Sequence, residues 1–295
     1  MNEAMVRQVR RFNRTVTQRV GALDDHYLAR DRPLGEARVL WEIGEDGCDV
    51  RRLRSVLTLD SGYLSRILRS LEADRLVTVG RHDDDRRVRT ARLTAAGSRE
   101  RAVLDRRSDA LARSFLEPLT GAQRERLVSA MGEVERLLTA ALVDIDAVDP
   151  GHRDARYCLD EYFAELDHRF PGGFDPSRSL STDLDDFRPP AGLFLVATLR
   201  AQPVGCGALK FRGPEPAELK RMWVASSARG LGVGRRLLAE LERRAADHGS
   251  RAVRLDTNGT LTEAIAMYRS AGYGEVEAFN DEPYAHHWFE KQLPR

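Results

Sequence analysis

A glycine-rich segment, Arg229-Gly-Leu-Gly-Val-Gly234, has the composition of an anion-binding turn. It lies between a strand-like run, Glu218–Val224, and a run with apolar residues at helical spacing, 233–245. At such a strand-to-helix turn, glycines expose backbone N–H groups and the helix N-terminus adds partial positive charge. We interpret the segment as a cradle for an anion, best matched by a pyrophosphate. Glycines that only permit a tight turn are the alternative.

The composition bounds the kind of chain that carries this segment. At 295 residues with 42% hydrophobic content, two ordinary domains are expected. There is no apolar run of about 18 residues, and the first residues lack the apolar core of a signal peptide, so we expect a cytoplasmic protein. The cysteines, Cys48, Cys158 and Cys206, are far apart, which favours buried thiols over a disulfide framework or a metal site.

The charge is uneven along the chain, although the net charge is only +1. Residues 1–142 hold 27 arginines against 22 acidic residues, and the remainder of the chain is acidic on balance. Within the first part, residues 51–101 hold 13 arginines against 7 acidic residues. The two parts are therefore expected to have different partners, and the arginines of the first can neutralise phosphates.

The first part reads as helices with one short hairpin. Two short helices joined by a tight turn, the second with a polar, Arg-bearing free face, are typical of a helix-turn-helix. The charged loop between the two strands is then a wing, whose arginines can contact phosphates or enter a minor groove; ordinary solvated charges are the alternative. The predicted elements are helices 4–29, 35–44, 49–56, 63–73, 95–116 and 121–141, and strands 76–79 and 88–93.

These elements, with the run Asp85-Arg-Arg-Val-Arg-Thr-Ala-Arg-Leu-Thr-Ala-Ala-Gly97 closing the wing, resemble the MarR family of winged-helix regulators over residues 3–141. The resemblance implies a homodimer built from the first and last helices, with helix 61–73 of each subunit in a major groove of double-stranded DNA. It also implies that residues of this helix and of the wing contact bases or phosphates. They are Ser61, Tyr63, Ser65, Arg66, Arg69, Arg86, Arg87 and Arg89.

The second part alternates strands and helices. Its first strand, 142–148, starts almost at the end of helix 121–141, so we divide the chain into domains 1–141 and 142–295 with a short, fixed join. A loop as long as 169–190 is more often functional than not. The further predicted elements are helices 152–168, 232–248 and 261–271, and strands 193–199, 204–211, 217–224, 252–256, 273–279 and 287–291.

This order of elements resembles the GNAT (Gcn5-related N-acetyltransferase) fold over residues 142–293. Arg229, Gly232 and Gly234 fit the family's phosphate-binding signature, Arg/Gln-x-x-Gly-x-Gly/Ala. The runs Leu255-Asp-Thr-Asn258 and Glu263-Ala-Ile-Ala-Met-Tyr-Arg-Ser-Ala-Gly-Tyr273 also match the family. The expected fold class is therefore multidomain: an all-α-rich winged helix-turn-helix domain followed by an α/β GNAT domain with a mixed, mostly antiparallel sheet.

The resemblance implies that acetyl-CoA is the cofactor and that the glycine segment binds its pyrophosphate. No Lys-Ser/Thr pair follows the glycines, as it does in a nucleoside triphosphate loop. Backbone N–H groups near residues 222–224 are implied to bind pantetheine and to polarise the thioester carbonyl. The implied cofactor-binding residues are Met222, Trp223, Val224, Arg229, Gly230, Leu231, Gly232, Val233, Gly234, Arg235, Asn258 and Tyr268.

Three side chains have roles that the resemblance implies. Tyr268 corresponds to the general acid that protonates the leaving thiolate, Glu218 to a base for the incoming amine, and Asn258 to a polar contact with the cofactor. Each has a structural alternative. Tyr268 can be a core tyrosine, Glu218 a strand carboxylate paired with Lys220 or Arg221, and Asn258 a turn residue.

The acceptor site is expected between the first helix of the second domain and the loop that joins its last two strands. The pair His286-His287 is not expected to bind a metal, because no second cluster of ligands accompanies it; one of the two could instead be a base. The candidate acceptor-binding residues are Arg169, Phe170, Phe174, Asn280, Asp281, Tyr284 and His286.

We therefore predict a bifunctional chain: a transcription regulator that binds double-stranded DNA, fused to an acetyl-CoA-dependent N-acetyltransferase acting on a small amine or amino acid. One alternative is a regulator whose second domain senses acetyl-CoA without chemistry. The other is an acetyltransferase whose winged-helix domain serves only for dimerisation. A short join between the domains predicts that binding in one can influence the other.

Overall fold

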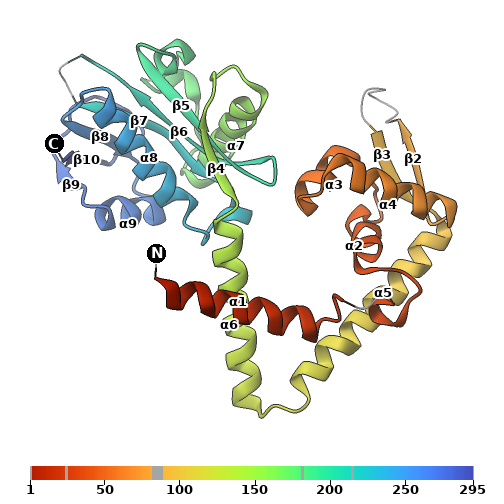
Figure 1. Ribbon diagram of the computed structural model, residues 1–295. Coiled ribbons are helices and arrows are strands. Elements are labelled where there is room, and N and C mark those ends of the chain that lie inside the picture. Colours follow the sequence, from red (N-terminus) through yellow and green to blue (C-terminus); the bar gives the residue numbers. More distant parts are fainter. Residues whose placement is uncertain (1, 24–25, 82–88, 181–182, 214–215, 295) are drawn as a thin grey trace. The chain divides into compact units, whose positions relative to one another are not determined.

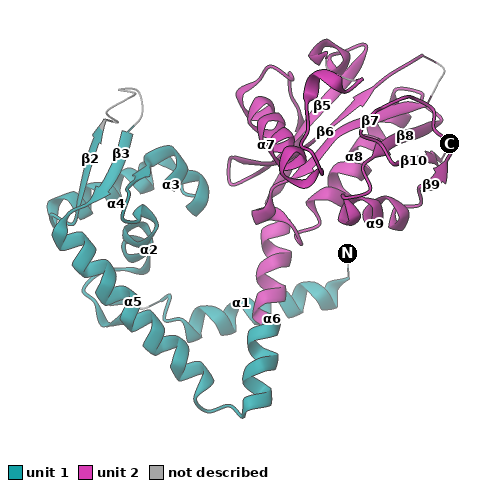
Figure 2. Cartoon of the chain, turned by 180° about the vertical axis from the view of Figure 1, so that it is seen from behind, with its two compact units in different colours: residues 1–130 teal, residues 131–295 magenta. Residues whose placement is uncertain are grey.

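The computed structural model describes residues 2–23, 26–81, 89–180, 183–213 and 216–294 (Figure 1). Contacts divide the chain into two compact units, Met1–Ala130 and Met131–Arg295 (Figure 2). This division falls within a helix, α6 (Gly121–Ala140), whereas the domain boundary that we propose, between residues 141 and 142, follows the end of that helix.

The first unit consists of helices and a small antiparallel sheet in the order β1-β3-β2. Its core lies where α2, α3, α4 and the sheet meet, around the buried residues Leu40, Leu53, Leu64 and Ala91. The elements are α1 (Glu3–Arg19), η1 (Tyr27–Ala29), α2 (Leu34–Ile43), β1 (Cys48–Asp49), α3 (Val50–Leu57), α4 (Ser61–Ala73), β2 (Val77–Arg81), β3 (Arg89–Leu93), α5 (Ala95–Leu116) and the first half of α6.

Local capping sets the turn between α3 and α4. Thr58 ends α3 with a left-handed φ of 52°, and the Asp60 carboxylate accepts a hydrogen bond from the Tyr63 amide at 2.9 Å. Because Asp60 is the N-cap, α4 begins at Ser61, two residues before the predicted start at Tyr63. The predicted helix-turn-helix is otherwise confirmed.

The prediction of one helix over residues 4–29 is wrong. Helix α1 ends at Arg19, and Gly21 follows with a φ of +67°. Further along, Leu28 has a φ of 54°, so the three-residue turn η1 cannot continue an α-helix. The Arg107 guanidinium of α5 donates to the Leu28 carbonyl at 2.6 Å, which is a tertiary contact that helical periodicity does not reveal.

The second unit is built on a seven-stranded sheet in the order β4-β5-β6-β7-β8-β10-β9. Every neighbouring pair is antiparallel except β7 and β8, which confirms the mixed, mostly antiparallel sheet. The elements are β4 (Val143–Ala147), α7 (Arg153–Arg169), η2 (Pro176–Arg178), η3 (Leu184–Phe187), β5 (Gly192–Leu199), β6 (Gln202–Lys210), β7 (Ala217–Val224), η4 (Ser226–Ala228), α8 (Val233–Asp247), β8 (Ala252–Thr257), α9 (Thr262–Ser270), β9 (Gly274–Val276) and β10 (His287–Gln292).

Helices cover both faces of this sheet. On one face, α8 packs its apolar stripe, including Leu237 and Leu241, against the central strands. On the other face, α7 packs Ala155 and Cys158 against β5 and β6. A strand was predicted over residues 273–279, but the observed strand β9 covers only Gly274–Val276. It is an exposed edge strand, and only these residues pair with β10.

Candidate functional site

Strands β7 and β8 separate near the centre of the sheet. Their parallel pairing covers Ala217 with Val253 and Glu218 with Arg254, whereas β7 continues to Val224 and β8 to residue 257. Beyond these two pairs, β7 and β8, which are both fully described, do not pair with each other. The opening between the strands can therefore offer backbone N–H groups to a ligand.

A β-bulge lies in β7 beside this opening. Arg221 and Met222 face the single residue Gly207, because the register of the pairing shifts between Cys206 and Ala208. Arg221 has a φ of 57°, which is uncommon for a residue other than glycine. A bulge interrupts the regular hydrogen-bond ladder between β6 and β7, in the segment where carbonyl-polarising N–H donors were predicted. The Arg221 carbonyl accepts a hydrogen bond from the Cys206 thiol there, at 3.2 Å.

Two cavities meet at the opening. The first, which we name the glycine cleft, contains Gly230, Gly232 and Gly234 in its wall, and the second, the aromatic pocket, contains Phe170, Phe174 and Tyr284. They are adjacent, since five residues line both of them. These shared residues are Tyr162, Leu166, Met222, Leu261 and Ala264.

The glycine cleft contains the predicted strand-to-helix turn. Gly230 and Gly232 have φ values of 80° and 75°, and Gly232 begins α8 without a side-chain cap. No acidic residue stands in the fully described first turn of α8, so its amides can meet an anion. A Cβ on Gly234 would lie 3.0 Å from the Met267 sulfur, so this glycine also permits close packing of α8. The turn fits the pyrophosphate of an acyl-CoA.

The guanidinium of Arg229 points away from this turn toward α7. It donates to both oxygens of Glu165, at 2.6 and 2.5 Å, and to the Val224 carbonyl at 3.1 Å. Glu165 also accepts hydrogen bonds from the Trp223 indole at 3.0 Å and from Arg169 at 3.2 Å. The Glu165 carboxylate therefore holds Arg229, the cation that was predicted to bind phosphate. Glu165 also lines the glycine cleft.

Most of the predicted cofactor-binding residues line the glycine cleft, and three do not. Leu231 packs against the hydrophobic core, and Asn258 and Tyr268 line the aromatic pocket. Those in the wall of the cleft are Met222, Trp223, Val224, Arg229, Gly230, Gly232, Val233, Gly234 and Arg235.

Tyr268 lies on α9 between the core and the aromatic pocket. Its side chain is buried, with its ring 5.8 Å from that of Tyr273 and 6.3 Å from that of Phe289. Burial raises the pKa of the Tyr268 hydroxyl above its usual value, and the nearby Tyr162 and Asp256 raise it further. The hydroxyl therefore stays protonated at neutral pH, as a proton donor must.

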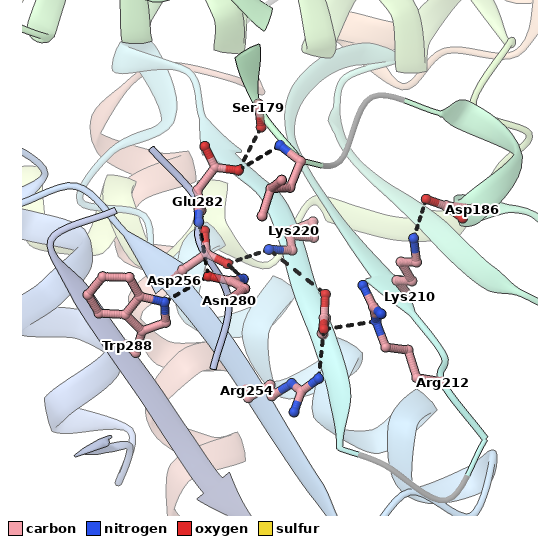
Figure 3. Close-up of polar contacts among 12 residues, drawn as sticks. Ser179, Asp186, Lys210, Arg212, Lys220, Arg254, Asp256, Asn280, Glu282 and Trp288 are labelled. Atoms are coloured by element: carbon pink, nitrogen blue, oxygen red, sulfur yellow. Dashed lines mark hydrogen bonds and ion pairs between the residues drawn. The ribbon is translucent and has the colours of Figure 1, made fainter. Parts of the chain in front are cut away.

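Glu218 lines neither of these cavities. Its carboxylate is buried, and it is paired with Arg212 and Arg254 at 2.9 Å and lies 3.9 Å from the Lys220 ammonium. Lys220 in turn reaches Asp256 (Figure 3). The structural alternative, a surface strand carboxylate paired with Lys220 or Arg221, is met only in part, because Glu218 is buried and its close partners are Arg212 and Arg254.

Asn258 uses its amide for protein contacts. Its Nδ2 donates to the Tyr284 carbonyl at 2.7 Å, and its Oδ1 accepts from the Thr260 amide and hydroxyl at 2.9 Å. This is the arrangement of a turn asparagine that also ties the loop before β10 to the end of β8.

The predicted acceptor-binding residues divide into three groups. Phe170, Phe174 and Tyr284 line the aromatic pocket together, and Arg169 lines the glycine cleft. Asn280 instead bonds to Asp256 and accepts from the Trp288 indole. The remaining two, Asp281 and His286, line neither cavity, and His286 accepts a hydrogen bond from the Gly259 amide at 3.1 Å.

Sequence reasoning missed several polar residues of these cavities. Lys220 and Arg221 were considered only as partners of Glu218, although they lie on the strand that forms the wall. Asp256 directly precedes the end of a buried strand, which is a usable signal for a site residue. Glu165 and Glu282 carry no local signal, because tertiary packing alone brings them to the cavities.

In the first unit, α4 exposes the face predicted to bind DNA. Leu64, Ile67, Leu68 and Leu71 are buried, whereas Ser61, Tyr63, Arg66 and Arg69 are exposed and Ser65 is half-buried. The Arg66 guanidinium lies 5.6 Å from the centre of the Tyr63 ring. Arg89 is exposed at the start of β3, and the wing residues Arg86 and Arg87 lie outside the described residues.

Comparison with known proteins gives a family for each part of the chain. Residues 31–88 match the model of the MarR family, and residues 159–273 match that of the acetyltransferase (GNAT) family. An IAA acetyltransferase of Azospirillum brasilense is 38% identical over 122 residues, which cover 41% of this chain and 78% of that protein. An uncharacterized N-acetyltransferase of Schizosaccharomyces pombe is 31% identical over 134 residues, covering 44% of this chain and 80% of that protein.

Among solved structures, an acetyltransferase of the GNAT family from Staphylococcus aureus is 18% identical. It covers 52% of this chain and 99% of that chain, with a TM-score of 0.45.

The uncapped glycine turn, the split between β7 and β8 and the sequence matches indicate an acyl-CoA-dependent N-acyltransferase, joined to a winged-helix region that matches the MarR-family model. The chain belongs to the GNAT acetyltransferase family through its second unit, and its first unit carries a MarR-family region. No helix within the described ranges is long and apolar enough to cross a membrane.

Proposed function

We propose that the second unit transfers an acetyl group from acetyl-CoA to the nitrogen of a small amine or amino acid. The observation that carries the proposal is the junction of the two cavities at Met222 and Ala264, beside the bulge in β7. A donor bound in the glycine cleft and an amine bound in the aromatic pocket would meet there. The protein would thus hold both reactants in an orientation suitable for reaction.

The chain's own groups supply the binding and the proton transfers. The first-turn amides of α8, with Arg229 and Arg235, would hold the donor's phosphates. Backbone N–H groups at the bulge would stabilise negative charge that develops on the carbonyl oxygen. Acetyl-CoA supplies a thioester carbon that is open to attack by an amine.

A carboxylate must accept a proton from the incoming ammonium group. We propose Asp256 for this role in place of Glu218, because Asp256 lines the aromatic pocket together with Tyr268 and is close enough to raise the pKa of the Tyr268 hydroxyl. The C–N bond forms as the C–S bond breaks. Of the two protons that the ammonium loses, one passes through Asp256 to solvent and the other balances the proton that Tyr268 gives to the sulfur.

A second candidate function is a regulator whose second unit senses acetyl-CoA without turnover. The pairing of Arg229 with Glu165 favours it, since donor binding could change a contact that exists without donor. Release of free coenzyme A from acetyl-CoA, measured with a panel of amines, distinguishes the two. Turnover with any amine supports the enzyme, whereas tight donor binding without turnover across the panel supports the sensor.

We propose that the first unit binds double-stranded DNA as a homodimer. Large apolar side chains are exposed on α1 and α6, including Met5 at 66%, Val9 at 57% and Leu138 at 63%, and neither helix, both fully described, has a buried residue. A second copy of the chain would cover them. Sedimentation at twice the chain mass of 33.2 kDa would support the dimer.

DNA binding itself is tested by a gel shift on the promoter region of the chain's own gene. Because phosphate contacts release counterions, affinity should fall steeply as salt rises. Absent or salt-independent binding would instead support the alternative in which the winged helix only dimerises.

A further inference from the structure

The aromatic pocket has one wall made of three packed rings. The ring centroids of Phe174 and Tyr284 lie 4.8 Å apart, and Phe170 lies 5.8 Å from each of them. All three line the pocket, and so do the apolar side chains of Leu166 and Leu261. Rings packed in this way offer large flat apolar surfaces to a ligand. The wall is therefore suited to an aromatic or bulky apolar group.

Most of the charged side chains in this pocket already have partners within the protein. Lys220 and Asp256 form an ion pair with each other (Figure 3). The guanidinium carbon of Arg221 lies 5.0 Å from the centre of the Phe163 ring, and Arg221 also interacts with Tyr162. These three charges are therefore engaged before any ligand binds.

The carboxylate of Glu282 has a different environment. Glu282 lines the pocket and is only 9% exposed. Its Oε2 accepts hydrogen bonds from the Ser179 hydroxyl at 3.0 Å and from the Leu180 amide at 2.9 Å, and both of these donors are neutral (Figure 3). In the described part of the chain, no side chain forms an ion pair with Glu282, and no donor reaches its Oε1. A buried carboxylate without a cation favours a positively charged ligand.

Hydrogen bonds fix Glu282 relative to the proposed base, Asp256. The backbone amide of Glu282 donates to the Asn280 side-chain oxygen at 3.4 Å, and Nδ2 of Asn280 donates to Oδ1 of Asp256 at 3.1 Å (Figure 3). Both carboxylates line the aromatic pocket, and Glu282 is two residues from Tyr284 of the aromatic wall. A cation-binding group, a proton acceptor and an apolar surface are thus combined in one pocket.

We infer that the acceptor is a primary amine that carries one positive charge and an aromatic or bulky apolar group, an inference that rests on the proposed acetyl transfer. Glu282 binds its ammonium group through a charge-assisted hydrogen bond. The wall of Phe170, Phe174 and Tyr284 receives its apolar group. Asp256 then accepts the proton, so binding and deprotonation of the amine fall to different carboxylates.

A second positive charge on the ligand does not suit this pocket. Lys220 and Arg221 are cations, and both line it. An additional ammonium group would be repelled by them, and its burial without a carboxylate would be costly. A polyamine is therefore a poorer acceptor than a monoamine.

Three compounds test this inference on the full chain saturated with coenzyme A. Phenethylamine should bind about 10-fold more tightly than its neutral isostere 2-phenylethanol, because the alcohol cannot make the charge-assisted hydrogen bond. Ethylamine, which keeps the ammonium group but lacks the ring, should bind about 100-fold more weakly than phenethylamine. Calorimetric titration measures the three dissociation constants. With acetyl-CoA as donor, kcat/KM should likewise be higher for phenethylamine than for ethylamine.

Two variants separate recognition of the charge from recognition of the ring. Glu282→Gln should bring phenethylamine to within about 2-fold of 2-phenylethanol without changing the Kd of the alcohol. Its amide oxygen can still accept the hydrogen bonds from Ser179 and Leu180, so the pocket should persist. Phe174→Ala should instead weaken both phenyl compounds and leave ethylamine unchanged. Equal weakening of phenethylamine and 2-phenylethanol by Glu282→Gln would contradict the role of this carboxylate.

The outcomes for the wild type distinguish this inference from the proposed function. Equal affinity for phenethylamine and 2-phenylethanol, or acetylation of a polyamine such as spermidine in preference to phenethylamine, would overturn the inference and leave the acetyltransferase intact. The expected order of affinities without acetylation of any amine would instead reject the proposed acetyl transfer, and with it the assignment of the bound amine as an acceptor.

Discussion

Arg229 and Glu165 form the contact in the glycine cleft that donor binding must change. The carboxylate holds the guanidinium by two hydrogen bonds and lies in the wall of a cleft that is proposed to receive phosphates. A negative charge beside an anion site opposes binding, and the paired arginine must leave it before it can contact a phosphate. We therefore expect Glu165 to lower affinity for the donor.

Replacing Glu165 by glutamine should strengthen acetyl-CoA binding by about 10-fold, since one repulsive charge is removed. The amide oxygen of Glu165→Gln can still accept the Trp223 indole hydrogen bond, so the local packing should persist. Calorimetric titration measures the effect. Glu161→Gln, on an exposed position of the same helix, is the matched control and should leave the Kd unchanged. Weaker binding by Glu165→Gln would contradict this account.

Two carboxylates on neighbouring strands have different predicted roles. Asp256→Asn should lower kcat by about 100-fold, because general base catalysis is lost. It should also lower stability by about 2 kcal/mol, because Lys220 loses the partner of a largely buried ion pair. Glu218→Gln should lower stability by about 2 kcal/mol, since Arg212 and Arg254 lose a charged partner, and should change kcat far less. Steady-state kinetics and thermal unfolding of both variants check the assignment. The opposite pattern would restore Glu218 as the base.

Local motifs predicted one half of the site and tertiary packing determines the other. The glycine turn was recognisable because its spacing is fixed within one turn, and Tyr268 was recognisable from the family resemblance of the run that contains it. Glu282 and Glu165 were not, because each reaches its cavity from a distant segment. The bulge at Arg221 was also hidden, since no glycine marks its positive φ.

At the level of elements, a buried carboxylate joins the segment after α1 to α5. Glu100 accepts hydrogen bonds from Arg30 at 2.8 and 2.5 Å, and it lies 3.5 Å from Arg32. These contacts explain why residues 27–32 leave the helical path that periodicity predicted. They also lower the pKa of Glu100, mainly through the hydrogen bond from Arg30.

Glu100→Gln should destabilise the first unit by about 2 kcal/mol at pH 7, because two arginines lose their ionised partner. A carboxylate whose pKa is lower in the folded than in the unfolded protein stabilises the fold at any pH above its unfolded-state pKa. This stabilisation is lost as the pH falls through the folded-state pKa. The difference in the free energy of unfolding between the wild type and the variant should therefore shrink below about pH 4.5. Native-state hydrogen exchange of α2 and α4 amides measures it.

Asp109→Asn provides the control for this prediction. Asp109 lies on the same helix and pairs with Arg113 at 3.8 Å, but both side chains are largely exposed, so its loss should have little effect. An effect of Glu100→Gln no larger than that of Asp109→Asn, or one independent of pH, would show that the buried pair does not stabilise the unit.

At the scale of the whole molecule, α6 begins in the first unit and ends in the second, where it contacts α8. The Arg236 guanidinium on α8 donates to the carbonyl of Ala140, the last residue of α6, at 2.6 Å and to that of Val143, the first residue of β4, at 2.7 Å. Helix α6 begins in the first unit, and the start of α8 is the proposed phosphate site. Donor binding at one end of α8 can thereby bias the end of α6.

We predict that saturating acetyl-CoA changes operator affinity by about 5-fold or more, and that operator DNA changes acetyl-CoA affinity by the same factor. Arg236→Met should remove most of this coupling while acetyl transfer continues. Fluorescence anisotropy with labelled operator, with and without acetyl-CoA, measures both. Identical operator affinity in the two conditions would mean that the units are merely joined.

We propose that the junction of the glycine cleft and the aromatic pocket is an active site with Tyr268 as its proton donor. Its most direct test is coenzyme A release by wild type and Tyr268→Phe, with acetyl-CoA and the best amine of the panel. We predict a fall in kcat of about 100-fold or more with an unchanged Kd for acetyl-CoA, because only the donated proton is lost. An unchanged kcat in the Tyr268→Phe variant, with donor binding intact, would contradict the account.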